Sequence, residues 1–238
     1  MSMNKLQSTS GASSANGIKM LVYGRSGMGK TRLCATLPNP LILSAESGLL
    51  SLREYNLPFW QINNVTDLTE AFNWVQGSNE ARSTFQSICL DSITEIAEQV
   101  LSNAKKLAKD PRQAYGALIE EMTDTVKKFR DLQGYHIYMS AKQAMNKDEV
   151  TGKQMYGPEM PGKVVGPSLP YLFDEVFMLG KNKDPQTQKD IHFLQTQSDF
   201  QVDAKDRSGA LDYYEWPDLG NVINKILGAT APGQPQAQ

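Results

Sequence analysis

Short apolar runs alternate with longer amphipathic stretches along the first 140 residues. Runs of mostly apolar residues, typical of buried strands, are IKMLVY at 18–23, LILSA at 41–45, FWQI at 59–62, SICLD at 87–91 and HIYMS at 136–140. Between these runs the apolar positions recur at helical spacing. The predicted helices run from Lys30 to before Pro38, over 66–76, and over 92–109 and 112–132 on either side of Pro111. This alternation predicts an α/β fold with a mostly parallel central sheet flanked by helices.

The character of the sequence changes after residue 140. Residues 141–170 contain repeated glycines and prolines with little apolar periodicity, which predicts a long loop or a short hairpin. Apolar runs at 174–180 and 190–197 then flank the turn-rich KNKDPQTQK, so we expect an antiparallel hairpin at the sheet edge. A helix over 217–227 closes the chain's single predicted domain, 17–227, and the compositions of 1–16 and 228–238 predict flexible tails.

Composition and charge narrow the class of protein. The chain has 238 residues, 40% of them hydrophobic, which is enough for one substantial core. No run approaches the roughly 20 apolar residues that cross a bilayer, and the N-terminus has no apolar signal-peptide centre. We therefore expect a cytoplasmic protein without membrane contact. A formal net charge of -2 is not typical of a nucleic-acid binder, so any DNA contact must be local.

Residues 24–31, GRSGMGKT, match the phosphate-binding pattern G-x-x-x-x-G-K-[ST] and join a predicted strand to a predicted helix. Glycines let consecutive backbone N–H groups point inward around a β-phosphate, and the helix N-terminus adds its positive dipole end. Lys30 is then expected to reach the β- and γ-phosphates, and the Thr31 hydroxyl to ligate Mg²⁺. The predicted cofactors are ATP and Mg²⁺, and the predicted nucleotide-binding residues are Gly24, Arg25, Ser26, Gly27, Met28, Gly29, Lys30, Thr31 and Arg32.

A second oxygen ligand for Mg²⁺ is expected where another strand ends. Asp91 ends SICLD and, with Thr31, is the predicted metal-binding pair. Asp91 also precedes a predicted helix, so it fits the role of a helix N-cap, and the two roles are compatible. Asp174 and Glu175 compete for the metal role, but they follow Pro170 and are interpreted as the entry to an edge strand.

The surroundings of the phosphate loop indicate the kind of nucleotide-binding protein. NKDE at 146–149 and NKDP at 182–185 lack the final Asp of the guanine motif N-K-x-D, which disfavours a GTPase. Ser92 follows Asp91 where AAA+ proteins carry a catalytic Glu, which disfavours that class. Glu46, just after LILSA, is the remaining candidate for a general base, and a solvated residue at a strand end is the alternative.

LILSAESGLL together with ICLDSITEI resembles the RecA-type recombinase core, in which an A-E pair ends one strand and a D-S pair ends the metal strand. The wider layout, including PYLFDEVFML and AKDRSG, is similar over 18–227 to the phage nucleotide-binding proteins of the Sak-four kind, minimal RecA-like ATPases associated with single-strand annealing. The resemblance implies a RecA-like P-loop NTPase, with Glu46 as the catalytic base that polarises the attacking water. It also implies the host cytoplasm if the protein is phage-encoded.

RecA-like proteins form filaments or rings with ATP at the subunit boundary, so the resemblance also implies self-assembly. Lys205 and Arg207 in AKDR are similar in placement to the family's K-x-K pair. They are the predicted catalytic residues that contact the γ-phosphate held by a neighbouring subunit. The alternative is a hairpin tip in which Asp203 and Asp206 neutralise both cations.

The strand end that senses the γ-phosphate in the RecA pattern corresponds here to Ser140, Lys142 and Gln143, and the family's Gln matches none of the three uniquely. The segment that follows, 144–168, is the predicted DNA-binding loop. The alternative is a surface loop in which Asp148, Glu149 and Glu159 largely cancel its lysines. The residues predicted to supply charge and a stacking ring to DNA are Lys147, Lys153, Tyr156 and Lys163.

The sequence therefore leads to the hypothesis of a DNA-stimulated RecA-like ATPase that assembles on single-stranded DNA and promotes annealing or homologous recombination. Its expected partners are single-stranded DNA, other copies of itself and a single-strand-binding protein. A weak basic patch repeated along an assembly gives many phosphate contacts, which reconciles DNA binding with the net charge. The alternatives are a helicase loader or ring-helicase-like motor, and a nucleotide-switched scaffold that does not bind DNA.

Overall fold

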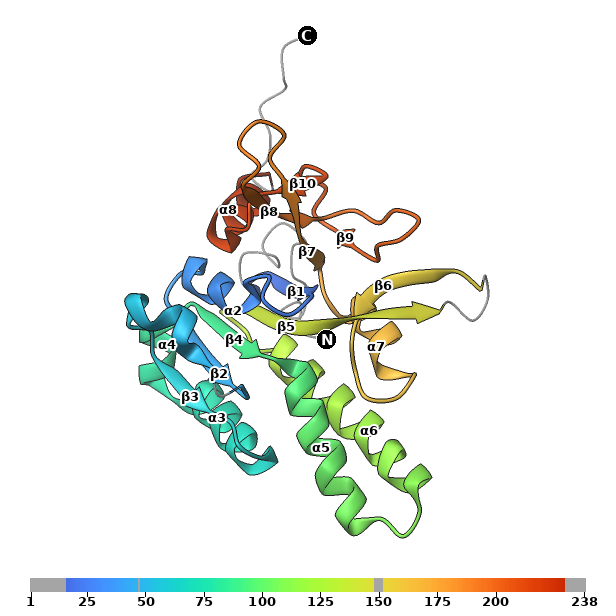
Figure 1. The fold of residues 1–238 in the computed structure, drawn as a ribbon. Coiled ribbons are helices and arrows are strands. Elements are labelled where there is room, and N and C mark those ends of the chain that lie inside the picture. The colour runs from blue at the N-terminus through green and yellow to red at the C-terminus, as the bar shows by residue number, and fades with distance from the viewer. Residues whose placement is uncertain (1–15, 47, 148–151, 230–238) are drawn as a thin grey trace, which may run out of the picture.

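A single mixed sheet organises the chain in the computed structural model, which describes residues 16–46, 48–147 and 152–229 (Figure 1). Within these ranges the strands follow the order β10-β8-β7-β1-β5-β4-β2-β3, with β6 paired to β5 and β9 paired to β7. The strands are β1 (Lys19–Gly24), β2 (Pro40–Ser44), β3 (Phe59–Gln61), β4 (Ser87–Asp91), β5 (His136–Lys147), β6 (Gln154–Pro158), β7 (Glu175–Lys183), β8 (Asp190–Gln195), β9 (Lys205–Asp206) and β10 (Tyr214–Glu215).

The centre of the sheet is parallel and its far side is antiparallel. Strands β3, β2, β4, β5, β1 and β7 pair in parallel, whereas β8 pairs antiparallel with β7 and with β10. This confirms the predicted α/β fold with a mostly parallel sheet and an antiparallel hairpin towards one edge, as expected of a RecA-like core. The interpretation of Asp174 and Glu175 as the entry to an edge strand is wrong, because β7 lies between β1 and β8.

Helices cover both faces of the sheet because successive side chains of each strand point to opposite faces. Leu21 and Tyr23 of β1 belong to the core beneath α3, α5 and α6, whereas Met20 and Val22 belong to the core beneath α2 and α8. Figure 1 shows α5 and α6 as an adjacent helix pair on one side of the sheet. The helices are α2 (Lys30–Leu33), α3 (Val65–Gly77), α4 (Asn79–Thr84), α5 (Ile93–Leu107), α6 (Pro111–Arg130), α7 (Val165–Ser168) and α8 (Leu219–Ala229).

Polar side chains define where the predicted helices begin. The side chains of Asn64, Ser92 and Asp110 accept hydrogen bonds from backbone N–H groups in the first turns of α3, α5 and α6, and Pro111 occupies the first turn of α6. Residues 34–36 continue α2 as a 3-10 turn, so the predicted helix from Lys30 to before Pro38 is confirmed in place but has only one α-helical turn. None of the helices in the described ranges is long and apolar enough to span a membrane.

The segment after residue 140 is an extended hairpin. Strand β5 continues to Lys147 and pairs antiparallel with β6 from Gln143↔Pro158 to Lys147↔Gln154, and Figure 1 shows the two strands as an arm that projects from the sheet. Of the two predicted forms, the hairpin is the correct one. Residues 148–151, which include Asp148 and Glu149, lie outside the described residues, as do most of the predicted tails, 1–15 and 230–238.

Candidate functional site

The phosphate loop joins the end of β1 to the start of α2, as the motif requires. Gly27 and Gly29 have φ values of 75° and 98°, which favour glycine because a Cβ atom strains the backbone there. Gly24 needs glycine for another reason: a Cβ on it would lie 2.8 Å from the Leu179 carbonyl oxygen of the adjacent β7. The glycines therefore serve both the loop conformation and its packing against the sheet.

The Lys30 ammonium lies over the loop. Its Nζ donates hydrogen bonds to the carbonyl oxygens of Gly24, at 2.8 Å, and Arg25, at 3.1 Å. Burial lowers the pKa of Lys30, and the nearby carboxylates of Asp91 and Glu46 oppose that change. The Tyr138 hydroxyl donates to the Lys30 carbonyl oxygen at 2.8 Å and anchors the first turn of α2 to β5. The ammonium is thus placed where an anion in the loop would contact it.

Asp91 connects three elements of the site. It is 1% exposed, and its two carboxylate oxygens accept hydrogen bonds from the hydroxyls of Thr31, at 2.7 Å, and Ser140. The structure thus brings the predicted metal pair, Thr31 and Asp91, into direct contact. A hydroxyl and a carboxylate are hard oxygen ligands of the kind that Mg²⁺ prefers, so these residues fit a magnesium ion. The N-cap of α5 is Ser92, whose Oγ accepts from the Glu95 N–H, so the expectation of an Asp91 cap is wrong.

A cleft of about 620 Å³ opens beside the loop. Glu46 follows the end of β2 and contributes to its wall, and its own carbonyl oxygen accepts a hydrogen bond from the Ser44 hydroxyl at 2.8 Å. Because β2 is adjacent to β4 and Ser44 pairs with Asp91, Glu46 follows the end of the strand next to the one that Asp91 ends. Of the predicted nucleotide-binding residues, those that line the cleft are Arg25, Ser26, Gly27, Gly29, Lys30, Thr31 and Arg32, whereas Met28 packs against the core beneath α2.

The three candidate γ-phosphate sensors differ in their contacts. Ser140 is fully buried and bonded to Asp91, whereas Gln143 lines the cleft. Lys142 also lines the cleft, but its ammonium forms ion pairs with Glu95 and, at 3.2 Å, with Glu98. These carboxylates raise the pKa of Lys142. Among the described residues, Gln143 is therefore the candidate that lines the cleft without an ion pair and without a hydrogen bond to Asp91.

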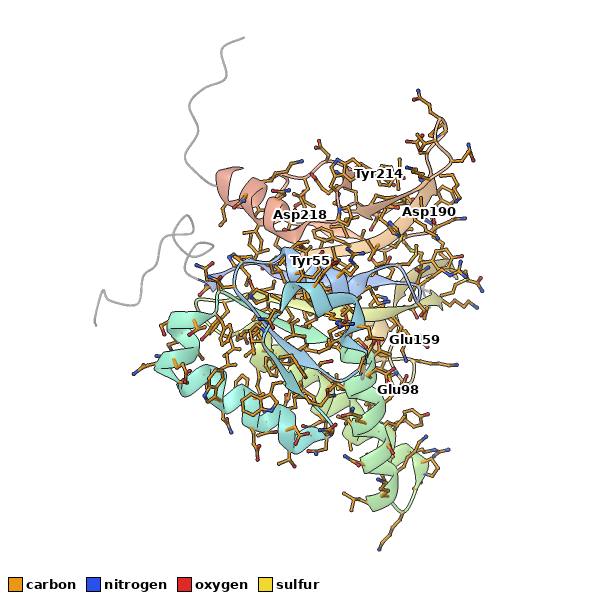
Figure 2. The ribbon with its side chains drawn as sticks, turned by 60° about the vertical axis from the view of Figure 1, so that its left-hand side comes forward. Tyr55, Glu98, Glu159, Asp190, Tyr214 and Asp218 are labelled. Atoms are coloured by element: carbon orange, nitrogen blue, oxygen red, sulfur yellow. The ribbon has the colours of Figure 1, made fainter. Side chains whose placement is uncertain are left out.

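Two acidic residues of the cleft were not predicted as site residues. Glu95 could have been found, because S-x-x-E at 92–95 is a capping-box pattern that fixes its position on α5. Glu159 had no such signal, and tertiary contacts place it: its N–H donates to the Lys142 carbonyl oxygen at 2.7 Å, and its carbonyl oxygen accepts from the Thr94 hydroxyl at 2.8 Å. Figure 2 shows Glu159 and Glu98 close together beside α5, which agrees with their shared lining of a smaller pocket.

Lys205 and Arg207 lie away from the phosphate loop of their own chain. Strand β9 pairs with the first residues of β7, whereas Gly24 packs beside Leu179 further along that strand. The Lys205 ammonium donates to the carbonyl oxygens of Pro170 and Phe173, so it is held inside its own subunit. The Arg207 guanidinium pairs with Asp174 at 2.9 Å and its side chain stays 60% exposed. Of the two cations, Arg207 is the one available to a neighbour.

The predicted DNA contacts are spread over the arm and the turn behind it. Lys147 ends β5 and Lys153 directly precedes β6, and both are exposed, as is Lys163 between β6 and α7. Tyr156 is half-buried and packs against the core, and its backbone bonds to the Gln201 carbonyl. The arm therefore exposes lysines to solvent, but the Tyr156 ring, which was predicted to stack on DNA bases, packs against the core of the protein itself.

Comparisons with known proteins agree with a nucleotide-binding core. A family model described as an AAA domain matches residues 16–208, and no curated protein matches the chain. Similar solved structures include a KaiC-like protein from the hyperthermophilic archaeon Pyrococcus horikoshii, 13% identical over 76% of this chain and 79% of that one, with a TM-score of 0.44. Another is the RadB recombinase, 15% identical over 76% and 89%, with a TM-score of 0.47. The family match is to an AAA domain, although Ser92 after Asp91 disfavours the AAA+ class.

Proposed function

The chain belongs to the AAA domain family, and from that premise we propose that it binds ATP with Mg²⁺, hydrolyses it, and assembles on single-stranded DNA to promote annealing or homologous recombination. One observation carries the nucleotide part of this proposal. Lys30, Thr31 and Asp91 meet at one end of the parallel sheet, and Glu46 lines the same cleft.

Each residue has a distinct role in the proposed hydrolysis. The loop amides and Lys30 bind and orient the phosphates, and Thr31 and Asp91 would hold Mg²⁺, which supplies charge neutralisation at the phosphate oxygens when bound. Glu46 accepts a proton from the attacking water as the general base. Ser140 keeps the Asp91 carboxylate oriented through its hydrogen bond. Gln143 and Lys142 are the proposed groups that respond to the γ-phosphate at the base of the arm.

In the proposed assembly, the surface of one copy that carries Arg207 contacts the phosphate-loop cleft of the next copy. Arg207 lies at the amino-terminal side of β7, away from its own phosphate loop, and its exposed guanidinium would exchange Asp174 for the phosphate in the cleft of the next subunit. A guanidinium beside the transferred phosphoryl group stabilises developing negative charge, as an arginine finger does. Lys205 acts by fixing the segment that carries Arg207, because its ammonium is bound to two carbonyl oxygens. Single copies would then hydrolyse ATP slowly.

The proposed DNA surface is the arm formed by β5 and β6. Lys147 and Lys153 are exposed along it. Lys142 and Gln143, which line the cleft, lie at the base of the arm on β5. A nucleotide in the cleft would contact the base of the arm, and DNA phosphates would contact the arm along its length. The continuous strand β5 would therefore connect the two sites. Repetition of the arm along an assembly multiplies a weak electrostatic contact.

The central experiment measures ATP turnover and particle size with and without single-stranded DNA. We expect DNA to raise both for the unaltered protein. Lys30→Ala should lose ATP binding and turnover, and Lys128→Ala, which removes an exposed lysine from α6, should behave as the unaltered protein. A turnover rate and a monomeric size that DNA leaves unchanged would reject the DNA-dependent cycle, and ATP binding by Lys30→Ala would reject the proposed nucleotide site. Strand separation of duplex DNA would instead favour a helicase-like motor.

A further inference from the structure

The segment between β8 and β9 exposes an aromatic ring to solvent. Phe200 lies in this segment and is 69% exposed, which makes it the most exposed phenylalanine of the described residues. A single exposed apolar side chain is normal on a protein surface, so exposure alone assigns it no role. The support and the surroundings of the ring decide what it can bind.

A turn with many hydrogen bonds carries Phe200. The carboxylate of the preceding Asp199 accepts four of them, from the backbone N–H groups of Gln201, at 2.7 Å, and Val202, at 2.8 Å, and from the side chains of Gln195, at 3.1 Å, and Tyr213, at 3.2 Å. Ser198 and Ala204 close the loop with two further hydrogen bonds. The backbone under the ring is therefore already ordered, so a ligand that contacts the ring does not have to order it.

The same turn is attached to the arm formed by β5 and β6. The Tyr156 N–H on β6 donates to the Gln201 carbonyl oxygen at 2.6 Å, and the Asp203 N–H donates to the Tyr156 carbonyl oxygen at 2.9 Å. The buried Tyr23 hydroxyl bonds to the carbonyl oxygens of both Tyr156 and Asp203. Figure 1 shows β6 and the segment before β9 on the same side of the sheet. Phe200, next to Gln201, is thus held beside the arm.

The exposed side chains of the arm and the turn differ in chemistry. Met145, opposite Tyr156 in the hairpin register, is 53% exposed, and the lysines at 147 and 153 are exposed further along the arm. Uncharged amide side chains are also exposed on β6 and on the turn, namely Gln154, Gln197 and Gln201. Apolar surface, amide groups and ammonium groups together fit a ligand in which flat rings are joined by anionic links, which describes single-stranded nucleic acid.

We propose that the Phe200 ring stacks on an unpaired base of single-stranded DNA whose backbone follows the arm. The assignment rests on the proposed function, because the DNA must first bind along β5 and β6. The ring supplies the stacking surface that the half-buried Tyr156 does not offer. Every base has a flat face, so this contact does not select a sequence. The bases of a duplex stack on one another, so the contact requires an unpaired strand.

Stacking and charge contacts respond differently to salt. A lysine that neutralises a phosphate releases counterions, so its loss should reduce the slope of log affinity against log salt concentration, by about 0.7 for each contact with a single strand. A phenylalanine ring carries no charge and displaces no counterion. Loss of the Phe200 ring should therefore weaken binding equally at low and high salt, whereas Lys147→Ala should reduce the slope.

Fluorescence anisotropy of a labelled 20-nucleotide thymidine strand tests the contact on the full chain with ATP and Mg²⁺. We expect Phe200→Ala to weaken binding at least fivefold and Phe200→Tyr, which keeps an aromatic ring, to restore most of the affinity. A strand of the same length without bases should bind Phe200→Ala and the unaltered protein equally. The control, Phe59→Ala, removes a ring that is 54% exposed on β3 at the other edge of the sheet, so it should change neither affinity.

Three results would overturn the stacking contact while the DNA function stands. These are equal binding of the thymidine strand by Phe200→Ala, an equal loss of affinity for the strand without bases, and a loss of assembled mass in light scattering without DNA, which would make Phe200 a contact between copies. If the unaltered protein binds no single-stranded DNA, the proposed function and the stacking contact fail together. Because the Phe200 side chain is exposed, its variants should keep the thermal transition of the unaltered protein.

Discussion

Glu175→Gln should remove a loss of folding stability that the unaltered protein undergoes as the pH rises. Glu175 is 1% exposed at the start of β7, and burial with the neighbouring Asp206 raises its pKa from 4.5 to about 9. The folded protein therefore keeps a proton on Glu175 at pH values where the unfolded chain has released it. Glutamine has nearly the same shape and does not titrate, so the variant removes the Glu175 ionisation from its pair with Asp206.

The size of the effect follows from the difference between the two pKa values. Below about pH 4.5 the group is protonated in both states, so it causes no pH dependence there. As the pH rises from 4.5 to 9, the group should lower the free energy of unfolding by up to about 1.4 kcal/mol per pH unit. Between pH 5.5 and 8.5 the accumulated loss is about 4 kcal/mol, a large share of the roughly 5–15 kcal/mol of a typical domain.

Urea denaturation of both proteins at pH 5.5, 7.0 and 8.5 measures this loss. The titrating groups remote from Glu175 are shared by the two chains, so the pH dependence of the difference between their free energies of unfolding reports Glu175 together with its neighbour Asp206. We expect that difference to shift in favour of Glu175→Gln as the pH rises. A difference that stays constant within about 1 kcal/mol across the three pH values would refute the raised pKa and its burial argument.

Three further changes test the phosphate-loop site. Gly24→Ala places a Cβ atom 2.8 Å from a backbone carbonyl oxygen, so it should cost about 1–3 kcal/mol of stability and weaken ATP binding. Thermal shift and ATP titration measure the two effects. The control, Gly116→Ala, adds a Cβ atom that meets no atom within 4 Å, so it should cause neither effect. Ser140→Ala removes a donor from Asp91 and should raise the Mg²⁺ concentration for half-maximal turnover several-fold; an unchanged Mg²⁺ curve would contradict the role of this contact. Arg207→Ala should preserve ATP affinity but lower turnover at least tenfold at assembling concentrations, and equal turnover would exclude a trans role.

The sequence predicted the parallel core well because β1, β2 and β4 are buried along their whole length. SICLD at 87–91 coincides with β4, and the runs at 18–23, 41–45 and 59–62 each match a strand to within one residue at either end. A continuous apolar run of this kind indicates a buried strand from its own residues, without information from the rest of the chain. For the hairpin arm the sequence left a long loop and a short hairpin open, because Gly and Pro interrupt the apolar pattern and the strand pairing depends on contacts between distant residues. The six-residue helix α4 was not predicted, because it has too few turns to show a periodic pattern.

The sequence alone determined which residues form the phosphate loop, because backbone conformation and phosphate contact are local demands that Gly24, Lys30 and Thr31 meet in adjacent positions. Only the tertiary structure decided how distant groups combine. It joined Asp91 to Thr31 and Ser140, bound Lys205 within its own subunit, and left Arg207 exposed. It also buried Glu175 beside a second cleft. Burial and charge balance arise when strands from different parts of the chain pair, so no local pattern encodes them.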